Sequence, residues 1–408
     1  MTTPEPGSLR AAFAVRDFRI MWTGSFLSTI GTWMQQVVMG SFVYKLTKST
    51  GHPSTYVAIL FLANNAPMMC FAMIAGDLAD RFNRRKWLTL LQSEQAVASI
   101  LLAVAVWTIP RPSIPLLFFL TLAVGLGNAF NAPAWTATLP QLVPREDLGG
   151  AIAAQSSMIN GTRVIGPAIA GILYPILGAG WIFFLNALTY LFVIGALQRV
   201  DLRRFVTSNR PFGQGFFDGV RLARSNKLVG QSLRFIPLFS FFCLPFLGLF
   251  APISEGHLGL DSKSPGYGWL YAVFGLGAVA GTVTLGTIFT RVDKGRLVRP
   301  FLAGFIVSLI LFALVTSPGP AYPVLFALGF CYFPTTTAMV TVLQRQITDQ
   351  VRGRVMALWF MGFGGTVPFG SLLFGSILDR HGARVVLLSG AVAASILWLI
   401  TDLRPTKS

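Results

Sequence analysis

Two long apolar runs flank the charged segment Gly76-Asp77-Leu78-Ala79-Asp80-Arg81-Phe82-Asn83-Arg84-Arg85-Lys86. The runs cover roughly residues 54–75 and 87–109, and each is long enough to cross about 30 Å of hydrocarbon as a helix. Six of these eleven side chains are charged, so the segment, called here the basic loop, marks a boundary between membrane and water. Four of the six are arginine or lysine, which assigns the basic loop to the cytoplasm under the positive-inside rule.

Composition indicates a multi-pass membrane protein. Hydrophobic residues make up 53% of the 408 residues, charged residues make up 12%, and the mean hydropathy is +0.64. A net charge of +17 would suggest nucleic-acid binding in a soluble protein, but here the basic residues fall in short loops between apolar spans. Residues 1–14 lack an apolar core followed by a small-residue cleavage site, so we expect no removable signal peptide.

The apolar runs predict an all-α integral membrane protein with twelve transmembrane helices. The expected spans are residues 18–44, 54–76, 87–109, 114–138, 150–176, 180–198, 229–255, 265–290, 297–316, 321–343, 354–379 and 383–401. An even number of spans places both termini on one side of the membrane.

The distribution of basic residues predicts which side that is. Of the 32 lysines and arginines, two lie inside spans and 24 lie on the side of the basic loop, so both termini are expected in the cytoplasm. The opposite side holds only six: Lys45, Lys48, Arg111, Lys263, Arg380 and Arg384.

A ladder of small residues repeats at a constant offset of 204, half the chain length. This repeat predicts two pseudo-symmetric six-helix bundles, over residues 1–200 and 229–408. Residues 201–228 are expected to form a cytoplasmic linker, in which residues 215–222 could form an interfacial helix. The ladder consists of Gly149, Gly161, Thr162, Gly166, Gly171 and Gly178, which recur as Gly353, Gly365, Thr366, Gly370, Gly375 and Gly382.

The basic loop resembles the G-x-x-x-D-R-x-x-R-R loop of the major facilitator superfamily, although Phe82 and Asn83 replace the more usual small or acidic residues. The segments 31–36, 132–135, 143–146, 160–167 and 352–356 resemble the drug:proton antiporter-3 branch, which groups enterobactin-exporter-like and macrolide-efflux-like exporters. The resemblance covers essentially the full chain. It implies a secondary exporter of a siderophore, drug or secondary metabolite, working by alternating access in exchange for protons.

The same resemblance implies a conformational latch on the cytoplasmic side. Asp80 ends the second span, and the free N–H groups at the start of the eleventh span favour a carboxylate. In the alternative interpretation, Asp80 only caps its helix or balances Arg84. The expected latch residues are Gly76, Asp80, Arg81, Arg84, Arg85, Arg352, Gly353 and Arg354.

Arg163 lies about 20 Å along the fifth span, where an arginine costs at least about 2.5 kcal/mol on insertion scales. We expect it to face a wet cavity and to bind an anionic or strongly hydrogen-bonding substrate group with its planar fork of donors. The alternative is a structural tie to backbone carbonyls or to Asn186. Glu94 in the third span is the candidate proton carrier, because burial favours a protonated carboxyl. Its alternative role is a charge network with Arg145.

Polar and aromatic residues within the spans are candidates for the wall of a substrate cavity, although polar groups also join helices in lipid. The cavity candidates are Trp33, Gln35, Gln36, Asn64, Asn128, Asn131, Arg163, Phe241, Tyr332 and Thr335. A packing motif of Gly161, Gly166, Pro167 and Gly171 is expected to face a second surface formed by Gly268, Gly275, Gly277 and Gly281.

No phosphate-binding loop, nucleophile–base set or metal-ligand spacing is present, so we expect neither an enzyme nor a cofactor. The expected partners are a small-molecule substrate, protons and membrane lipid, with no nucleic acid, and the protein is expected to be a monomer. Uptake of a small metabolite, movement of lipid, and a non-transporting sensor or assembly subunit are the alternatives.

Overall fold

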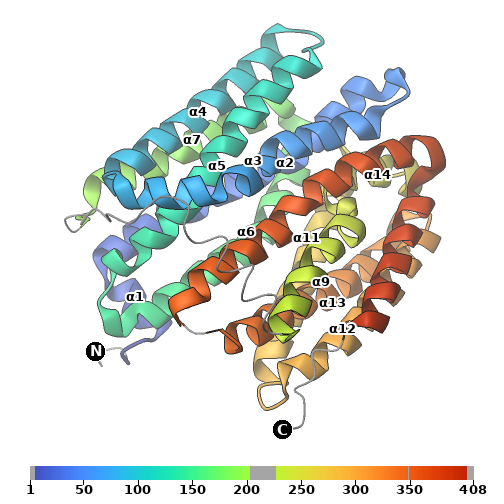
Figure 1. Ribbon diagram of the computed structural model, residues 1–408. Helices are drawn as coiled ribbons and strands as arrows, with labels where there is room; N and C mark the ends of the chain where they lie inside the picture. Colours follow the sequence, from blue (N-terminus) through green and yellow to red (C-terminus); the bar gives the residue numbers. More distant parts are fainter. Residues whose placement is uncertain (1–4, 203–226, 348, 402–408) are drawn as a thin grey trace.

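The computed structural model describes residues 5–202, 227–347 and 349–401, without the side chains of residues 72, 73, 80, 227, 349–354 and 357. The described chain is helical throughout (Figure 1). The first half contains α1 (Leu9–Ala14), α2 (Arg16–Thr47), α3 (Pro53–Arg81), α4 (Arg84–Thr108), α5 (Ile114–Leu142), α6 (Leu148–Leu177) and α7 (Ala179–Arg199). The second half contains α9 (Lys227–Cys243), α10 (Phe250–Leu258), α11 (Pro265–Thr287), α12 (Lys294–Leu314), α13 (Pro318–Arg345) and α14 (Asp349–Ile400), with short 3₁₀ turns at Lys48–Thr50 (η1), Arg145–Asp147 (η2) and Pro245–Leu247 (η3).

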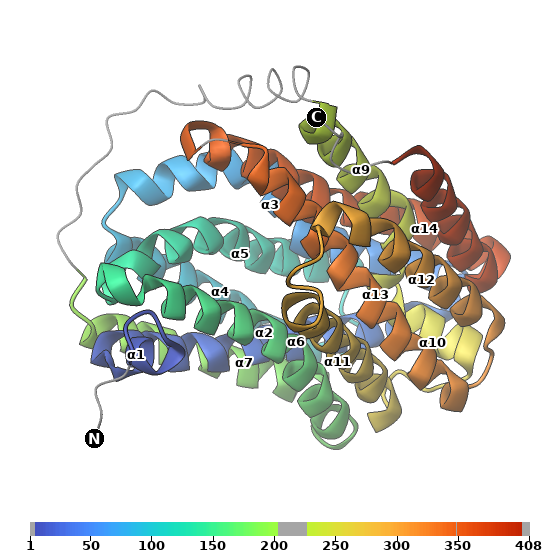
Figure 2. The ribbon, with the colours of Figure 1, turned by 90° about the horizontal axis from the view of Figure 1, so that it is seen from below.

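These elements make twelve spans in two bundles. Figure 2 shows the first half, coloured blue to green, beside the second half, coloured yellow to red. Eight of the described helices are long and apolar enough to cross a membrane by length and composition alone. Large apolar side chains such as Phe119, Ile176 and Val392 are exposed on the molecular surface, as expected where lipid replaces water.

One predicted span differs in form from the expectation, and two others are joined end to end. The seventh, expected to run unbroken over residues 229–255, consists of α9 and α10 joined by η3, because Pro245 cannot continue the helical hydrogen bonding. The eleventh and twelfth are two arms of α14 that meet at Gly382, whose φ of 79° suits glycine.

The repeat at offset 204 is present in the backbone. Gly178 and Gly382 have nearly the same left-handed φ, 80° and 79°. A Cβ on Gly166 would lie 3.0 Å from the carbonyl oxygen of Ile30 in α2, and a Cβ on Gly370 would lie 2.1 Å from that of Phe241 in α9. The fifth and eleventh spans therefore pack in the same way on the first helix of their own bundle.

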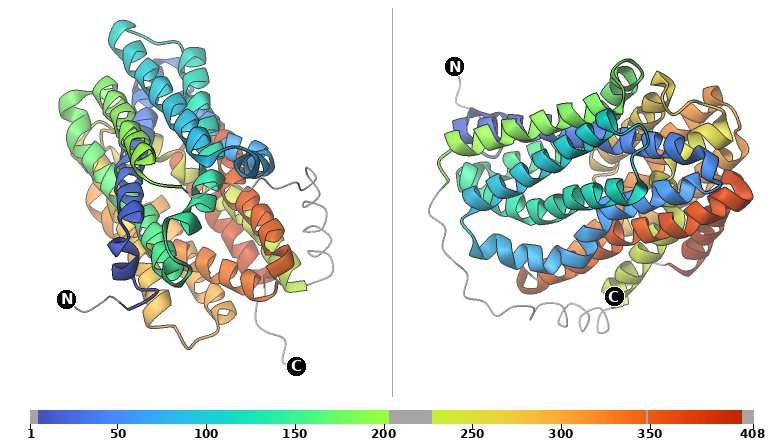
Figure 3. Two further views of the ribbon diagram at one scale, coloured as in Figure 1. Left: turned by 90° about the vertical axis from the view of Figure 1, so that its left-hand side faces the viewer. Right: turned by 90° about the horizontal axis from the view of Figure 1, so that it is seen from above.

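The next step of the ladder joins the two bundles. A Cβ on Gly171 would lie 2.7 Å from the Cα of Gly268 in α11, and one on Gly375 would lie 3.0 Å from the carbonyl oxygen of Ser54 in α3. Helix α6 thus packs against α11, and α3 packs against the first arm of α14 (Figure 3). These two helix pairs form the interface between the bundles.

The expected facing surface on α11 is only half correct. Gly268 and Gly275 face α6, but Gly277 and Gly281 pack closely against Phe326 and Phe330 of α13. The spacing of seven residues between Gly268 and Gly275 keeps them on one side of the helix, whereas Gly277 and Gly281 lie on another.

The first helix is fastened to a loop far along the chain. The backbone N–H of Gly7 donates to Oδ1 of Asp147 at 3.0 Å. A Cβ on Gly150 would lie 2.2 Å from the carbonyl oxygen of Ser8, so α1 contacts the start of α6 at backbone distance. We call this contact the α1 clasp.

Candidate transport cavity

We call the face where α2 begins and α14 ends the terminal face, and the opposite face the distal face. A cavity of about 270 Å³ lies between the bundles, close to the lower limit of ordinary small-molecule pockets. Of the described residues that line it, Arg163 alone is charged. The other lining residues are Trp33, Gln36, Phe61, Asn65, Asn160, Leu247, Tyr271, Phe274, Gly275, Ala278, Val279, Tyr332, Phe333, Phe363, Gly364 and Val367.

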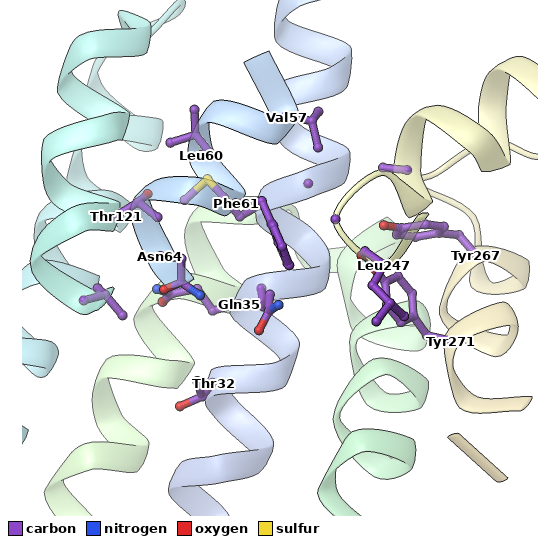
Figure 4. A pocket seen from close by; sticks show the side chains of 16 residues that line it. Thr32, Gln35, Val57, Leu60, Phe61, Asn64, Thr121, Leu247, Tyr267 and Tyr271 are labelled. Atoms are coloured by element: carbon purple, nitrogen blue, oxygen red, sulfur yellow. Dashed lines mark hydrogen bonds between the residues drawn. The ribbon is translucent and has the colours of Figure 1, made fainter. Parts of the chain in front are cut away.

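A second cavity of about 40 Å³ adjoins the first and shares Gln36, Phe61, Leu247 and Tyr271 with it. Figure 4 shows its first-bundle wall, where Thr32 and Gln35 of α2 lie near Asn64 of α3 and Thr121 of α5. Tyr267 and Tyr271 of α11 lie on the other side. The two cavities form one polar and aromatic compartment between the halves.

Arg163 lies between two aromatic rings that belong to different bundles. Its guanidinium carbon is 5.6 Å from the ring centroid of Trp33 in α2 and 5.1 Å from that of Phe333 in α13. Its Nε is buried and has no hydrogen-bond partner among the described residues. The expected alternative partner, Asn186, instead donates to Oε1 of Gln35 at 2.9 Å. Cation–π attraction is therefore what holds the guanidinium here.

Glu94 lies inside the first bundle, outside both cavities. Its Oε2 is buried without a hydrogen-bond partner among the described residues, and a Cβ on Gly127 of α5 would lie 2.3 Å from it. Arg145, the expected alternative partner, is exposed in η2. A neutral carboxyl suits this site better than an ionised one, because burying an unpaired charge is costly.

The other cavity candidates divide into two groups. Trp33, Gln36 and Tyr332 line the larger cavity, and Gln35 and Asn64 line the smaller one. Four candidates line neither cavity: Asn128, Asn131, Phe241 and Thr335.

Two of those four have partners inside their own bundle. Asn131 accepts a hydrogen bond from Nε2 of Gln92 at 3.1 Å between α4 and α5, and Thr335 donates to the carbonyl of Cys331 one turn earlier. Polar groups in spans thus join helices as well as line cavities, and the sequence does not distinguish the two roles.

Several lining residues were not among the sequence candidates. Asn65 follows Asn64, and Asn160 lies one helical turn before Arg163, so helical spacing could have found both. The aromatic residues Tyr271, Phe274 and Phe363 carry no such signal, because aromatic residues are frequent in all the spans.

Asp379, at the distal end of the first arm of α14, caps the start of α3 across the interface. Its Oδ1 accepts a hydrogen bond from the backbone N–H of Ser54 at 2.9 Å. Its Oδ2 accepts from the backbone N–H of Thr55 at 2.9 Å and from the Thr55 hydroxyl at 2.7 Å. A carboxylate from one bundle thus satisfies free N–H groups at a helix start of the other.

A second group of bonds closes the distal face around Glu255 of α10. Lys45 and Lys48 from the first bundle lie 3.7 and 3.3 Å from its carboxylate oxygens. Lys45 also pairs with Asp261 at 2.6 Å. Burial raises the pKa of Asp261, but the hydrogen bond from Lys45 and the nearby lysine charges outweigh it and hold that pKa below its ordinary value of 3.8. We call these bonds, the Asp379 cap and the Gly171–Gly268 contact the distal seal.

The expected latch at the terminal face is only partly described. Arg84 donates to the carbonyl of Ala137 at 2.5 Å, and Arg85 donates to the carbonyl of Val200, so both hydrogen bonds stay within the first bundle. No atom of the described residues lies within 4 Å of the position that a Cβ on Gly76 would take, and Arg81 is exposed. The side chains of Asp80, Arg352 and Arg354, and the surroundings of Gly353, lie outside the described part.

Similar proteins support a transporter. The chain is 23% identical over 372 residues to the staphyloferrin A transporter of Staphylococcus aureus, covering 89% of this chain and 90% of that protein. It is 24% identical over 384 residues to the enterobactin exporter EntS of Escherichia coli, covering 94% and 89%.

Solved structures show the same fold. A bacterial homologue of the iron transporter ferroportin matches with a TM-score of 0.68 at 17% identity, covering 93% of this chain and 97% of that one. The xylose transporter XylE from E. coli matches with a TM-score of 0.71 at 11% identity, covering 95% and 97%. The family model described as transmembrane secretion effector matches residues 8–408. The chain therefore belongs to this family of major facilitator superfamily membrane transporters.

Proposed function

We propose that the protein exports a small molecule across a bacterial inner membrane by alternating access, in exchange for protons. The observation that carries the proposal is the compartment between the two bundles, closed toward the distal face by bonds that cross the interface. Opening the distal face would require breaking these bonds, which is the movement that alternating access needs.

The orientation follows from the charges. Six of the 32 basic residues lie toward the distal face, so the terminal face with the basic loop is the cytoplasmic one. With this orientation the distal seal would close the compartment toward the outside, and we infer that a substrate reaches Arg163 from the cytoplasm.

The substrate class is supported by the relatives, one named as a transporter of staphyloferrin A and another as an exporter of enterobactin. A siderophore, a drug or a secondary metabolite is therefore the expected cargo. Glu94 is the proposed proton carrier, since its Oε2 atom is buried in the first bundle without a hydrogen-bond partner among the described residues.

Secretion and proton flux test this proposal. Culture media of cells with and without the gene are compared by mass spectrometry, and the metabolite lost on deletion is then tested in everted vesicles with an imposed pH gradient. We expect accumulation that a protonophore abolishes at constant ATP. Unchanged media would favour a non-transporting sensor, and inward movement in whole cells would favour uptake of a metabolite or lipid.

A further inference from the structure

We propose that Arg163, Trp33 and Phe333 form a binding site for a flat, aromatic, anionic group. This inference rests on the proposed function, because it names the class of substrate that the transport compartment accepts. Among the described residues that line the two cavities there is no Asp or Glu, and Arg163 alone is charged. These residues therefore attract an anion without an opposing carboxylate, and the attraction between buried charges is stronger than in bulk water.

The guanidinium contacts aromatic rings and keeps a buried N–H group without a hydrogen-bond partner among the described residues, so it can bind an anion. The rings of Trp33 and Phe333 lie within 5.6 Å of its carbon atom, and its Nε has no partner among the described residues. A carboxylate or phenolate can therefore bond the edge of the guanidinium, where its donors form a planar fork.

The surrounding rings favour a flat substrate. Tyr332 is stacked with Phe274 at 6.0 Å and 22° between planes, and with Phe363 at 6.4 Å and 16°. These nearly parallel rings come from α11, α13 and α14 and offer faces against which another aromatic ring can stack. Asn65 and Asn160 also line the cavity and can form hydrogen bonds with polar substituents on the substrate ring.

Three probes of similar size test the site on purified protein in detergent. Benzoate is flat and anionic, benzamide is flat and neutral, and cyclohexanecarboxylate is anionic but not flat. We expect benzoate to bind at least about tenfold more tightly than either of the others by calorimetry. Absence of benzoate binding, or equal affinities, would overturn the inference.

Substitutions separate charge from shape. Arg163→Met should remove the preference for benzoate over benzamide, whereas Arg163→Lys should retain part of it. Phe333→Leu should reduce the preference over cyclohexanecarboxylate and leave the preference over benzamide. A monodisperse elution profile checks that each variant folds. If vesicles export the metabolite but the three probes bind with equal affinity, this site is refuted and the proposed function stands. If benzoate binds more tightly than the other probes but vesicles export nothing, the proposed export is refuted and the binding site stands.

A different observation supports a second inference. The segment at the end of the first arm of α14 repeats the spacing of the basic loop: Gly375, Asp379, Arg380 and Arg384 correspond to Gly76, Asp80, Arg81 and Arg85, each at an offset of 299. We infer that it is a latch of the same type at the opposite face.

The geometry of Asp379 supports this second latch. Helix α3 and the first arm of α14 are packed together and run in opposite directions, so each ends beside the start of the other (Figure 3). At the distal end the carboxylate of Asp379 already accepts three hydrogen bonds from Ser54 and Thr55. The basic loop, where the sequence predicts the first latch, lies at the other end of the same helix pair, so the second latch would be its counterpart at the distal face.

Neutralising Asp379 tests the latch. Asp379→Asn removes the charge that favours the helix start and leaves one acceptor oxygen in place of two, so it should raise the population open at the distal face by about 2- to 30-fold, the range that follows from losing a charge at a helix N-terminus. The measurement is the labelling rate, from the distal side, of a cysteine in place of Ser41, which is buried at the interface. Arg111→Gln is the matched control, because Arg111 is a basic residue assigned to the same face and is exposed in the loop between α4 and α5, outside the proposed latch. Equal labelling in Asp379→Asn and the unsubstituted chain, at normal membrane levels, would overturn the inference.

Discussion

Replacing Gly268 with alanine adds a methyl group to a backbone contact between the two bundles. The new Cβ would lie 2.4 Å from the Cα of Gly171 and 2.6 Å from the carbonyl oxygen of Pro167, whereas ordinary contacts begin near 3.4 Å. Both neighbours are backbone atoms that cannot rotate away, so α6 and α11 must separate by about 1 Å. Overpacking of this kind costs about 1–3 kcal/mol. Because the cost falls only on the sealed state, the ratio of open to sealed molecules should rise roughly 5- to 150-fold.

The assay measures how quickly a cysteine in place of Ser41 reacts with a membrane-impermeant maleimide from the distal side. The three native cysteines, Cys70, Cys243 and Cys331, are first replaced. Gly161→Ala is the matched control, because Gly161 lies on α6, the helix that Gly268 contacts, and its Cβ would meet no described residue within 4 Å. Labelling of Gly268→Ala at the rate of this control, with both proteins inserted normally, would refute the claim that the contact helps to seal the distal face.

Three further predictions concern the latch, the coupling and the pH response. Asp80→Asn should weaken closure at the terminal face and lower export while the protein still inserts, and full transport with unchanged labelling on both faces would discard the latch. Glu94→Gln should retain substrate binding but lose the pH dependence of transport in vesicles, and a normal pH profile would return Glu94 to a structural role. The lowered pKa of Asp261 means that its stabilising pair with Lys45 is present at neutral pH and is lost only as the pH falls below about 3.8. Maleimide reacts with the thiolate, so each distal labelling rate is divided by that of an exposed cysteine at the same pH. This ratio should be unchanged between about pH 7.5 and 5.5, and a rise in the ratio as the pH falls would place a titrating group in the distal seal.

The fold was predictable because its signals are local and repeated. Apolar runs of fixed length predicted the spans, and the offset of 204 predicted that Gly178 and Gly382 would be equivalent, which their φ values confirm. The break between α9 and α10 was not predictable from hydropathy, because residues 229–255 are apolar on both sides of Pro245.

The cavity was less predictable, because a sequence does not show which neighbour a polar side chain meets. Gln36 and Asn131 are both amides within spans, yet Gln36 lines the cavity and Asn131 bonds to Gln92 inside its bundle. Asp379 is a different case. Its spacing from Gly375 and Arg384 repeats the basic loop, so a search for that pattern would have found it from the sequence alone.

The α1 clasp sets an order of events during synthesis. The Asp147 carboxylate that bonds Gly7 is 140 residues further along the chain. At about 5–20 residues per second, the ribosome needs roughly 7–28 s to make that distance. Helix α1 therefore leaves the ribosome long before its docking site exists, and it has to wait at the membrane surface until four spans and the start of the fifth have been made. Helix α1 can dock only when the loop before α6 has reached the same side of the membrane as the amino terminus. A protease that cuts α1 before docking but not after it would therefore show when this stage of insertion is reached.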